Sequence, residues 1–110
     1  MVLSKVKEIG IGKKLDFLVS NYADDILSLN SEGCDLDAMM RQIILSRTYL
    51  QNYVNFLQFK GTEEEKRFGI EGSYRFEKLD ECLMFLMRFE YGIEIYLNED
   101  AISYETVSRV

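Results

Sequence analysis

Apolar side chains recur along this chain at intervals of three and four residues, the spacing that places them on one face of an α-helix. Gly10 and Gly12 are expected to separate a short helical start over residues 2–9 from a first long helix over residues 13–30. The turn-forming residues before Gly33 are expected to end that helix. Its apolar face consists of Leu15, Leu18, Val19, Tyr22, Ile26 and Leu29.

The clearest helical pattern lies over residues 35–60. Asp35 can accept hydrogen bonds from the free amides of the helix start, and Gly61 follows Lys60 as glycine commonly follows a last helical turn. Apolar residues follow one another at alternating intervals of four and three residues, and such residues form the apolar seam of a heptad-like helix. The seam consists of Leu36, Met40, Ile43, Leu50, Val54 and Leu57. Only Arg47 interrupts it.

A third helical region contains two glycines. Thr62 and Glu65 have the spacing of a capping box, which marks its start. Gly69 and Gly72 predict a break, after which Ser73 caps a fresh helix that runs to about residue 91. One continuous helix from residue 63 is the alternative.

The pattern changes towards the C-terminus. The apolar run from Cys82 to Met87 leaves little polar surface, so this part of the third helix is expected to be packed on several sides. Gly92 is expected to stop the helix, and residues 93–97 have the character of an extended segment. Asn98 to Asp100 then form a turn or the cap of a last short helix. That helix would carry Ile102, Tyr104 and Val107.

These elements predict an all-α fold, a small bundle of three to four main helices, with an irregular or extended segment near residues 93–97. The length of 110 residues suits one domain over residues 1–110 with a single core. Apolar residues make up 47% of the chain and charged residues 29%, which is a globular balance. No proline is present to break a helix.

The formal net charge of −6 limits the classes of partner. An acidic surface repels the phosphate backbone, so nucleic-acid binding is disfavoured and a protein with a basic surface is the expected partner. No apolar run approaches the ~18 residues that a membrane span requires. We therefore expect no membrane partner. No secretory signal is recognisable at the N-terminus, so the predicted location is cytoplasmic.

The absence of histidine removes the commonest general base and a principal metal ligand. The many carboxylates form neither the Glu-x-x-His pattern of helical metal sites nor a calcium loop, so we expect helix caps and solvated faces. Cys34 and Cys82 lack an activating neighbour and are expected to be reduced, partly buried thiols. We therefore predict no catalytic residues, no metal site and no cofactor, and hence no enzyme.

Partner binding is the remaining kind of function, and residues 35–60 offer the candidates. Arg47 on an apolar seam must meet a counterion, either inside the fold or across an interface. Tyr49, Tyr53 and Phe56 lie outside the seam, as do Leu45 and Phe59, and could form a recognition surface or pack in the core. We predict a non-catalytic adaptor, inhibitor, immunity or chaperone-like protein that binds through Arg47, Tyr49, Tyr53 and Phe56. Homodimerisation through this helix would cover its excess of apolar surface.

In the C-terminal third, the run Phe89-Glu90-Tyr91-Gly92-Ile93-Glu94-Ile95 is followed by Thr106-Val107. This pattern resembles acyl carrier proteins, which have an aromatic-Gly-Ile-Glu-Ile run after their recognition helix and then a Thr-Val pair. The resemblance implies a small four-helix bundle that is recognised by partner proteins with basic surfaces. The phosphopantetheine serine is missing, because Phe76 to Asp80 occupy the matching region and Ser73 is the nearest serine. The alternative function is therefore a diverged carrier-like protein without a prosthetic group.

Overall fold

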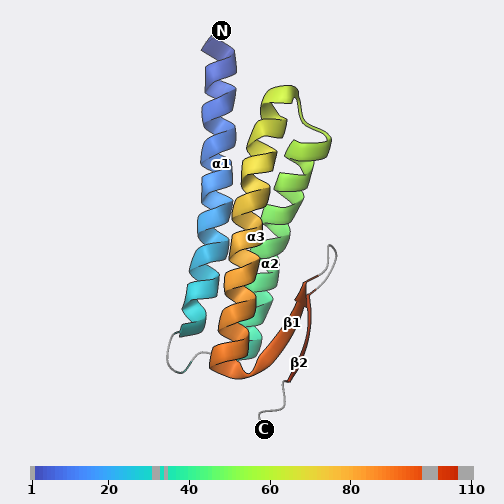
Figure 1. The fold of residues 1–110 in the computed structure, drawn as a ribbon. Helices are drawn as coiled ribbons and strands as arrows, with labels where there is room; N and C mark the ends of the chain where they lie inside the picture. The colour runs from blue at the N-terminus through green and yellow to red at the C-terminus, as the bar shows by residue number, and fades with distance from the viewer. Residues whose placement is uncertain (1, 31–32, 34, 98–101, 107–110) are drawn as a thin grey trace.

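Three long helices lie side by side and a β-hairpin packs against one end of them (Figure 1). The computed structural model describes residues 2–30, 33, 35–97 and 102–106. The all-α bundle with a short extended segment is confirmed, with three main helices in the part of the chain that is described. The elements are α1 (Val2–Leu27), a 3-10 turn η1 (Ser28–Asn30), α2 (Leu36–Phe59), α3 (Glu63–Tyr91), β1 (Ile93–Leu97) and β2 (Ile102–Thr106).

The predicted helix caps of α2 and α3 are confirmed. The Asp35 carboxylate accepts hydrogen bonds from the backbone amides of Asp37 (3.1 Å) and Ala38 (3.3 Å). At α3, the Thr62 hydroxyl accepts from the Glu65 amide while the Glu65 carboxylate accepts from the Thr62 amide, which completes the capping box. Each cap satisfies backbone donors that the first helical turn leaves without a partner.

The predicted breaks at glycines are wrong, and the continuous third helix considered as the alternative is confirmed. α1 runs through Gly10 and Gly12 without interruption. A glycine inside a helix costs only about 1 kcal/mol, which the packing of an apolar face outweighs. In α3, a Cβ on Gly69 would lie 2.7 Å from Gln58 of α2, and one on Gly72 would lie 2.9 Å from Leu15 of α1. These two glycines therefore permit close helix contact.

The C-terminal helix predicted to carry Ile102 and Tyr104 is also wrong. β1 and β2 pair antiparallel, with Ile93 opposite Thr106 and Leu97 opposite Ile102. Apolar residues at alternate positions of both segments suit strands better than one helical turn. Val107 and the predicted turn or cap at residues 98–100 lie outside the described residues. The extended segment at residues 93–97 is confirmed as β1.

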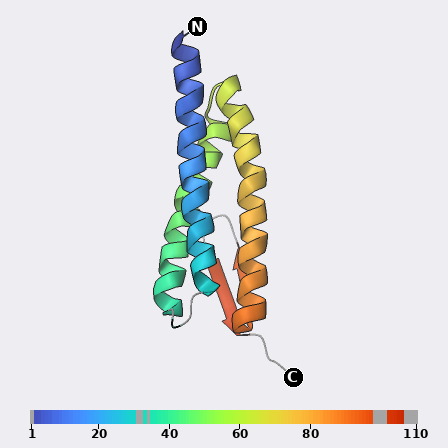
Figure 2. The same ribbon diagram turned by 90° about the vertical axis from the view of Figure 1, so that its left-hand side faces the viewer.

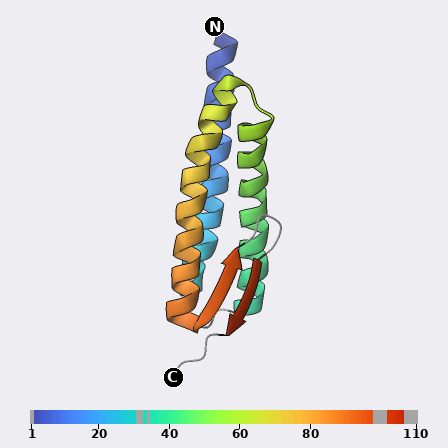
Figure 3. The same ribbon diagram turned by 45° about the vertical axis from the view of Figure 1, so that its right-hand side comes forward.

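The core lies along the axis of the bundle and contains the predicted apolar faces. Leu15, Tyr22 and Ile26 of α1 are at most 2% exposed, as are Ile43, Leu50 and Leu57 of α2. Ile95 of β1 adds to this core near the ends of α2 and α3, where Figure 3 shows the hairpin lying across both helices. The hairpin thereby covers one of the three grooves between neighbouring helices at that end.

The prediction that the run from Cys82 to Met87 is packed on several sides is wrong. Leu83 and Met87 are fully buried, whereas Met84 and Phe85 are 37% and 59% exposed. The reason is the small size of the bundle: α1 and α2 contact α3 from one side, and its opposite side has no neighbour among the described residues (Figure 2). No helix in the described part of the chain has the length and apolar character to span a membrane.

Candidate protein-binding surfaces

A buried polar cluster joins the three helices at the centre of the bundle. Arg47 of α2 donates from Nε to Oδ1 of Asp80 on α3 (3.0 Å) and from Nη2 to Oδ2 (2.9 Å). The hydroxyl of Tyr22 on α1 donates to the same Asp80 Oδ1 (2.6 Å). The residues are 5% (Arg47), 9% (Asp80) and 0% (Tyr22) exposed. A two-pronged arginine–carboxylate pair of this kind is among the stronger polar contacts in proteins.

An aromatic ring completes the surroundings of this cluster. The Arg47 guanidinium carbon lies 4.9 Å from the centre of the Phe76 ring, which is 6.1 Å from the ring of Tyr22. Burial, followed by the negative charge of Asp80, raises the pKa of Tyr22 far above its usual range. Burial alone would lower the pKa of Arg47, but the hydrogen bonds and charge of Asp80 raise it overall. Both groups therefore keep their protons in the folded protein.

Arg47 is thus paired inside the fold, which decides between the two alternatives left open by the sequence. Its side chain is not presented to a partner, so its assignment as a binding residue does not fit the structure. Sequence reasoning missed Asp80, although a signal was present. Asp80 continues the spacing of Phe76, Leu83 and Met87 and is therefore a charged residue on an apolar seam, as Arg47 is on α2.

The other predicted binding residues lie on or near the outer face of α2. Tyr49 is 63% exposed and Phe56 47% exposed, and Phe59 is 76% exposed near the end of the helix. Tyr53 is half-buried, because it lies at the junction with α1, where the Lys14 ammonium sits 4.6 Å above its ring. Burial and the negative charge of Glu65 raise the pKa of Tyr53. The structure therefore brings Tyr49 and Phe56 together on one face and places Tyr53 at its edge.

A second surface was not predicted: an open groove between α1 and α3, on the side of the bundle away from α2. At the hairpin end it encloses about 730 Å³. Leu27 and Phe85 on its rim are 61% and 59% exposed, and Phe85 stacks on Phe89 with ring centres 4.4 Å apart. The lining residues are Ala23, Ile26, Leu27, Asn30, Lys78, Leu79, Glu81, Cys82, Phe85 and Leu86.

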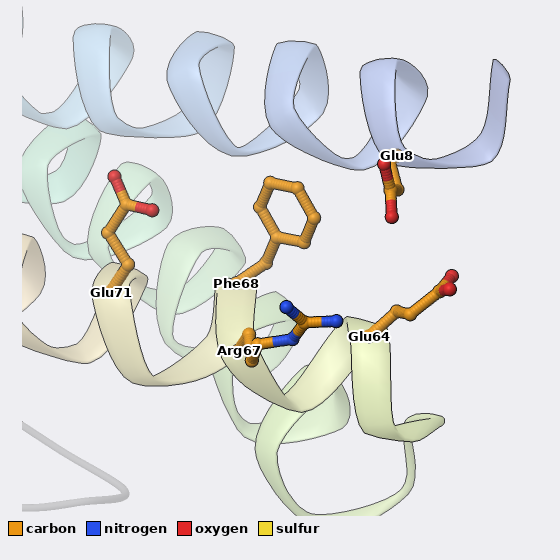
Figure 4. A pocket seen from close by; sticks show the side chains of 5 residues that line it. All are labelled: Glu8, Glu64, Arg67, Phe68 and Glu71. Carbon is orange, nitrogen blue, oxygen red and sulfur yellow. The ribbon is translucent and has the colours of Figure 1, made fainter. Parts of the chain in front are cut away.

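The same junction of α1 and α3 has a different character towards the N-terminus of α1. A smaller hollow of about 250 Å³ lies here. Figure 4 shows Phe68 pointing from α3 towards α1. Three carboxylates and one guanidinium line it: Glu8, Glu64, Glu71 and Arg67. Between the two hollows, Arg75 of α3 forms an ion pair with Asp16 of α1 at 2.7 Å. The junction between α1 and α3 therefore has an acidic end and an apolar end. We call the whole junction, with both hollows, the α1–α3 groove.

The structure corrects the expectation for one of the two thiols. Cys82 is a free thiol and is exposed in the apolar part of the α1–α3 groove rather than partly buried. Cys34 lies outside the described residues. Among the residues that the structure describes, no three cysteine, aspartate or glutamate side chains come together as potential metal ligands.

Comparisons with known proteins provide no relative. No family model, no curated protein and no solved structure matches the chain. The run that resembles acyl carrier proteins forms the end of α3, the turn at Gly92 and strand β1. That resemblance is tested by none of these comparisons and stays a prediction.

Proposed function

We propose that this protein is a non-catalytic binding module whose α1–α3 groove takes an amphipathic helix with a basic end from another protein. The observation that carries the proposal is the division of one continuous helix junction into an apolar half and an acidic half. Such a partner would act as a fourth helix beside α1 and α3. Binding of a partner helix in this groove would be sufficient for an adaptor or an inhibitor.

The apolar half supplies the contact area. Leu27, Phe85 and Phe89 are all more than half exposed and lie together at the hairpin end, where water covers them in the isolated chain. Aromatic and leucine side chains in such a hollow are typical anchoring points for the apolar stripe of a helix. Lys78 and Glu81 at the rim have opposite charges, so this end has no preference for either sign.

The acidic half determines the sign of the partner. Glu8, Glu64 and Glu71 outnumber Arg67, and the net charge of the whole chain is also negative. Lysine or arginine side chains near this hollow would be attracted to it, and acidic partners would be repelled. The groove therefore selects a helix with lysine or arginine at one end and a stripe of apolar residues towards the other.

The length of the groove suits a helix. The lining residues of α3 extend from Glu64 to Leu86, which corresponds to roughly 33 Å of helix at 1.5 Å per residue. A partner helix of about 22 residues would cover this distance. The hairpin leaves this junction open, because it lies across α2 and α3 instead (Figure 3).

A defined peptide can test the proposal. The probe is a helical peptide of about 20 residues with a leucine stripe and with lysines confined to one end, compared with a version in which glutamates replace the lysines. Fluorescence anisotropy should show binding of the lysine peptide only. Phe85→Asp should weaken binding about tenfold or more, because it places a charge among the anchoring side chains.

Matched variants locate the site. Tyr74→Asp changes an aromatic residue of α3 that is 65% exposed and lines a hollow next to α2, so binding should be unchanged. The double variant Glu64→Gln and Glu71→Gln should weaken binding about threefold and reduce its dependence on salt. Protection of Cys82 from alkylation by the bound peptide, in a Cys34→Ser background, would agree. Equal losses for Phe85→Asp and Tyr74→Asp, or equal binding of both peptides, would refute the proposal.

A further inference from the structure

The outer face of α2 carries a second stripe at heptad spacing, opposite the buried seam that contains Arg47. Its members follow one another at intervals of four, three, four and three residues, the spacing by which helices pack side by side. Leu45 is 50%, Tyr49 63%, Phe56 47% and Phe59 76% exposed, and Asn52 is exposed at the centre. We call these five residues the outer stripe of α2.

The segment of α2 that carries the outer stripe has no exposed charged residue. From Gln42 to Phe59 the only charged residue is Arg47, which is buried and paired with Asp80. In a chain of which 29% is charged, an uncharged surface of this length with exposed aromatic rings has the composition of an interface centre. This composition also distinguishes the outer stripe from the α1–α3 groove, which has an acidic end.

The absence of charge indicates what covers the stripe. Two copies of a protein with a net charge of −6 repel each other, and this repulsion costs least where the two contacting surfaces carry no charge. The outer stripe meets this condition, whereas a basic partner would gain no electrostatic attraction there. We therefore infer that the outer stripe of α2 pairs with the same stripe of a second copy.

The order of residues along the stripe gives the orientation of the pair. Leu45 and Phe59 lie seven residues on either side of Asn52, while Tyr49 lies three before it and Phe56 four after it. In an antiparallel pair centred on Asn52, each leucine meets a phenylalanine and each tyrosine meets a phenylalanine. The contact is then the same for both copies, as two-fold symmetry requires.

Asn52 fits the centre of this arrangement because its amide both donates and accepts hydrogen bonds. It can therefore bond to the same residue of a second copy, which neither a carboxylate nor an ammonium group can do. A single asparagine in an otherwise apolar helix seam also fixes the register, since a shifted pair would leave its amide without a partner. One helix from each copy forms the contact, so the dimer should be weak and dependent on concentration.

The first experiment measures size. Sedimentation velocity of the full chain from about 1 μM to about 1 mM should show a reversible shift from monomer to dimer. Phe56→Glu should abolish the dimer, because it places two carboxylates in the contact. Phe85→Glu, in the α1–α3 groove, should leave the dimer unchanged. A monomer at every concentration, or a dimer that survives Phe56→Glu while Phe85→Glu disrupts it, would overturn the inference.

Disulfide trapping then tests the orientation, in a background with Cys34→Ser and Cys82→Ser. Asn52→Cys should form a covalent dimer on mild oxidation, because the two residues meet on the symmetry axis. Leu45→Cys and Phe59→Cys should not dimerise alone but should cross-link when mixed. Rapid cross-linking of Leu45→Cys with itself would show a parallel pair and refute the antiparallel one. Neither result depends on the peptide-binding groove.

Discussion

The two faces of α2 have the same spacing of apolar residues and different surroundings. The inner seam packs against α1 and α3 and contains one polar residue at its centre, Arg47, whose charge is neutralised by Asp80. The outer stripe also contains one polar residue at its centre, the neutral Asn52, and lies in solvent. One helix of a small bundle therefore carries a buried seam with a charged residue at its centre and an exposed stripe with a neutral residue at its centre, and we propose that the exposed stripe pairs with a second copy.

Removing the counterion of the inner seam should have the largest effect. Asp80→Leu leaves the Arg47 guanidinium buried without a carboxylate, which typically costs about 3 to 5 kcal/mol of unfolding free energy. Urea unfolding followed by circular dichroism measures the loss. Glu81→Leu, at the next and exposed position, is the control and should change stability by less than about 0.5 kcal/mol.

An apolar replacement of the whole cluster tests whether the loss arises from the unpaired charge. The triple variant Tyr22→Phe, Arg47→Met and Asp80→Leu should recover most of the stability lost in Asp80→Leu, since no charge or hydroxyl is left buried without a partner. A triple variant as unstable as Asp80→Leu would mean that the shape of Asp80, rather than its charge, matters.

The second largest effect should come from the apolar part of the inner seam. Leu57 is fully buried, so Leu57→Ala should cost about 2 to 5 kcal/mol through lost burial and the cavity that remains. Thermal unfolding and urea unfolding should agree on the loss. A change below about 1 kcal/mol would show that the end of α2 is less tightly packed than the structure indicates.

The third effect concerns the hydroxyl of Tyr22. Tyr22→Phe removes one hydrogen bond to a charged group, and about 1 to 2 kcal/mol of stability should be lost at neutral pH. Burial holds the pKa of Tyr22 above its ordinary value of 10, so the unfolded chain releases this proton first as the pH rises. Stability should therefore fall above about pH 10 in the wild type and less steeply in Tyr22→Phe. Parallel slopes in urea titrations at several pH values would contradict this.

The smallest effect should come from the outer stripe. Phe56 is the direct neighbour of Leu57 in sequence but lies on the opposite face, so Phe56→Ala should change the stability of the dilute monomer by no more than about 0.5 kcal/mol. The measurement is urea unfolding at low micromolar concentration. A loss close to that of Leu57→Ala would mean that the two faces are not different.

Local sequence patterns were sufficient to predict the helical regions, the buried faces of α1 and α2, and the caps of α2 and α3, because each depends on residues close together in the sequence. It could not assign a function to glycine: Gly69 and Gly72 were predicted to break α3, and instead they allow α3 to approach Gln58 and Leu15. Glycine weakens a helix and also permits close packing, and only the position of the neighbouring helix decides between these roles.

The candidate sites were predicted less completely. Tyr49 and Phe56 were identified as exposed aromatic candidates, but the need of Arg47 for a counterion did not identify Asp80, which lies 33 residues away. The α1–α3 groove escaped prediction because its two walls come from opposite ends of the chain. The run from Cys82 to Met87 was apolar enough for a core, and the number of neighbouring helices decided that half of it faces solvent.

The buried cluster also restricts how the three helices can be assembled. Stripes made only of leucine, isoleucine and valine would tolerate a slide of one helix by a turn, about 5.4 Å, with little change in contact area. Tyr22, Arg47 and Asp80 come one from each helix, and such a slide would separate a guanidinium from its carboxylate inside the bundle. The three side chains thus specify a single alignment of the helices among several of similar packing.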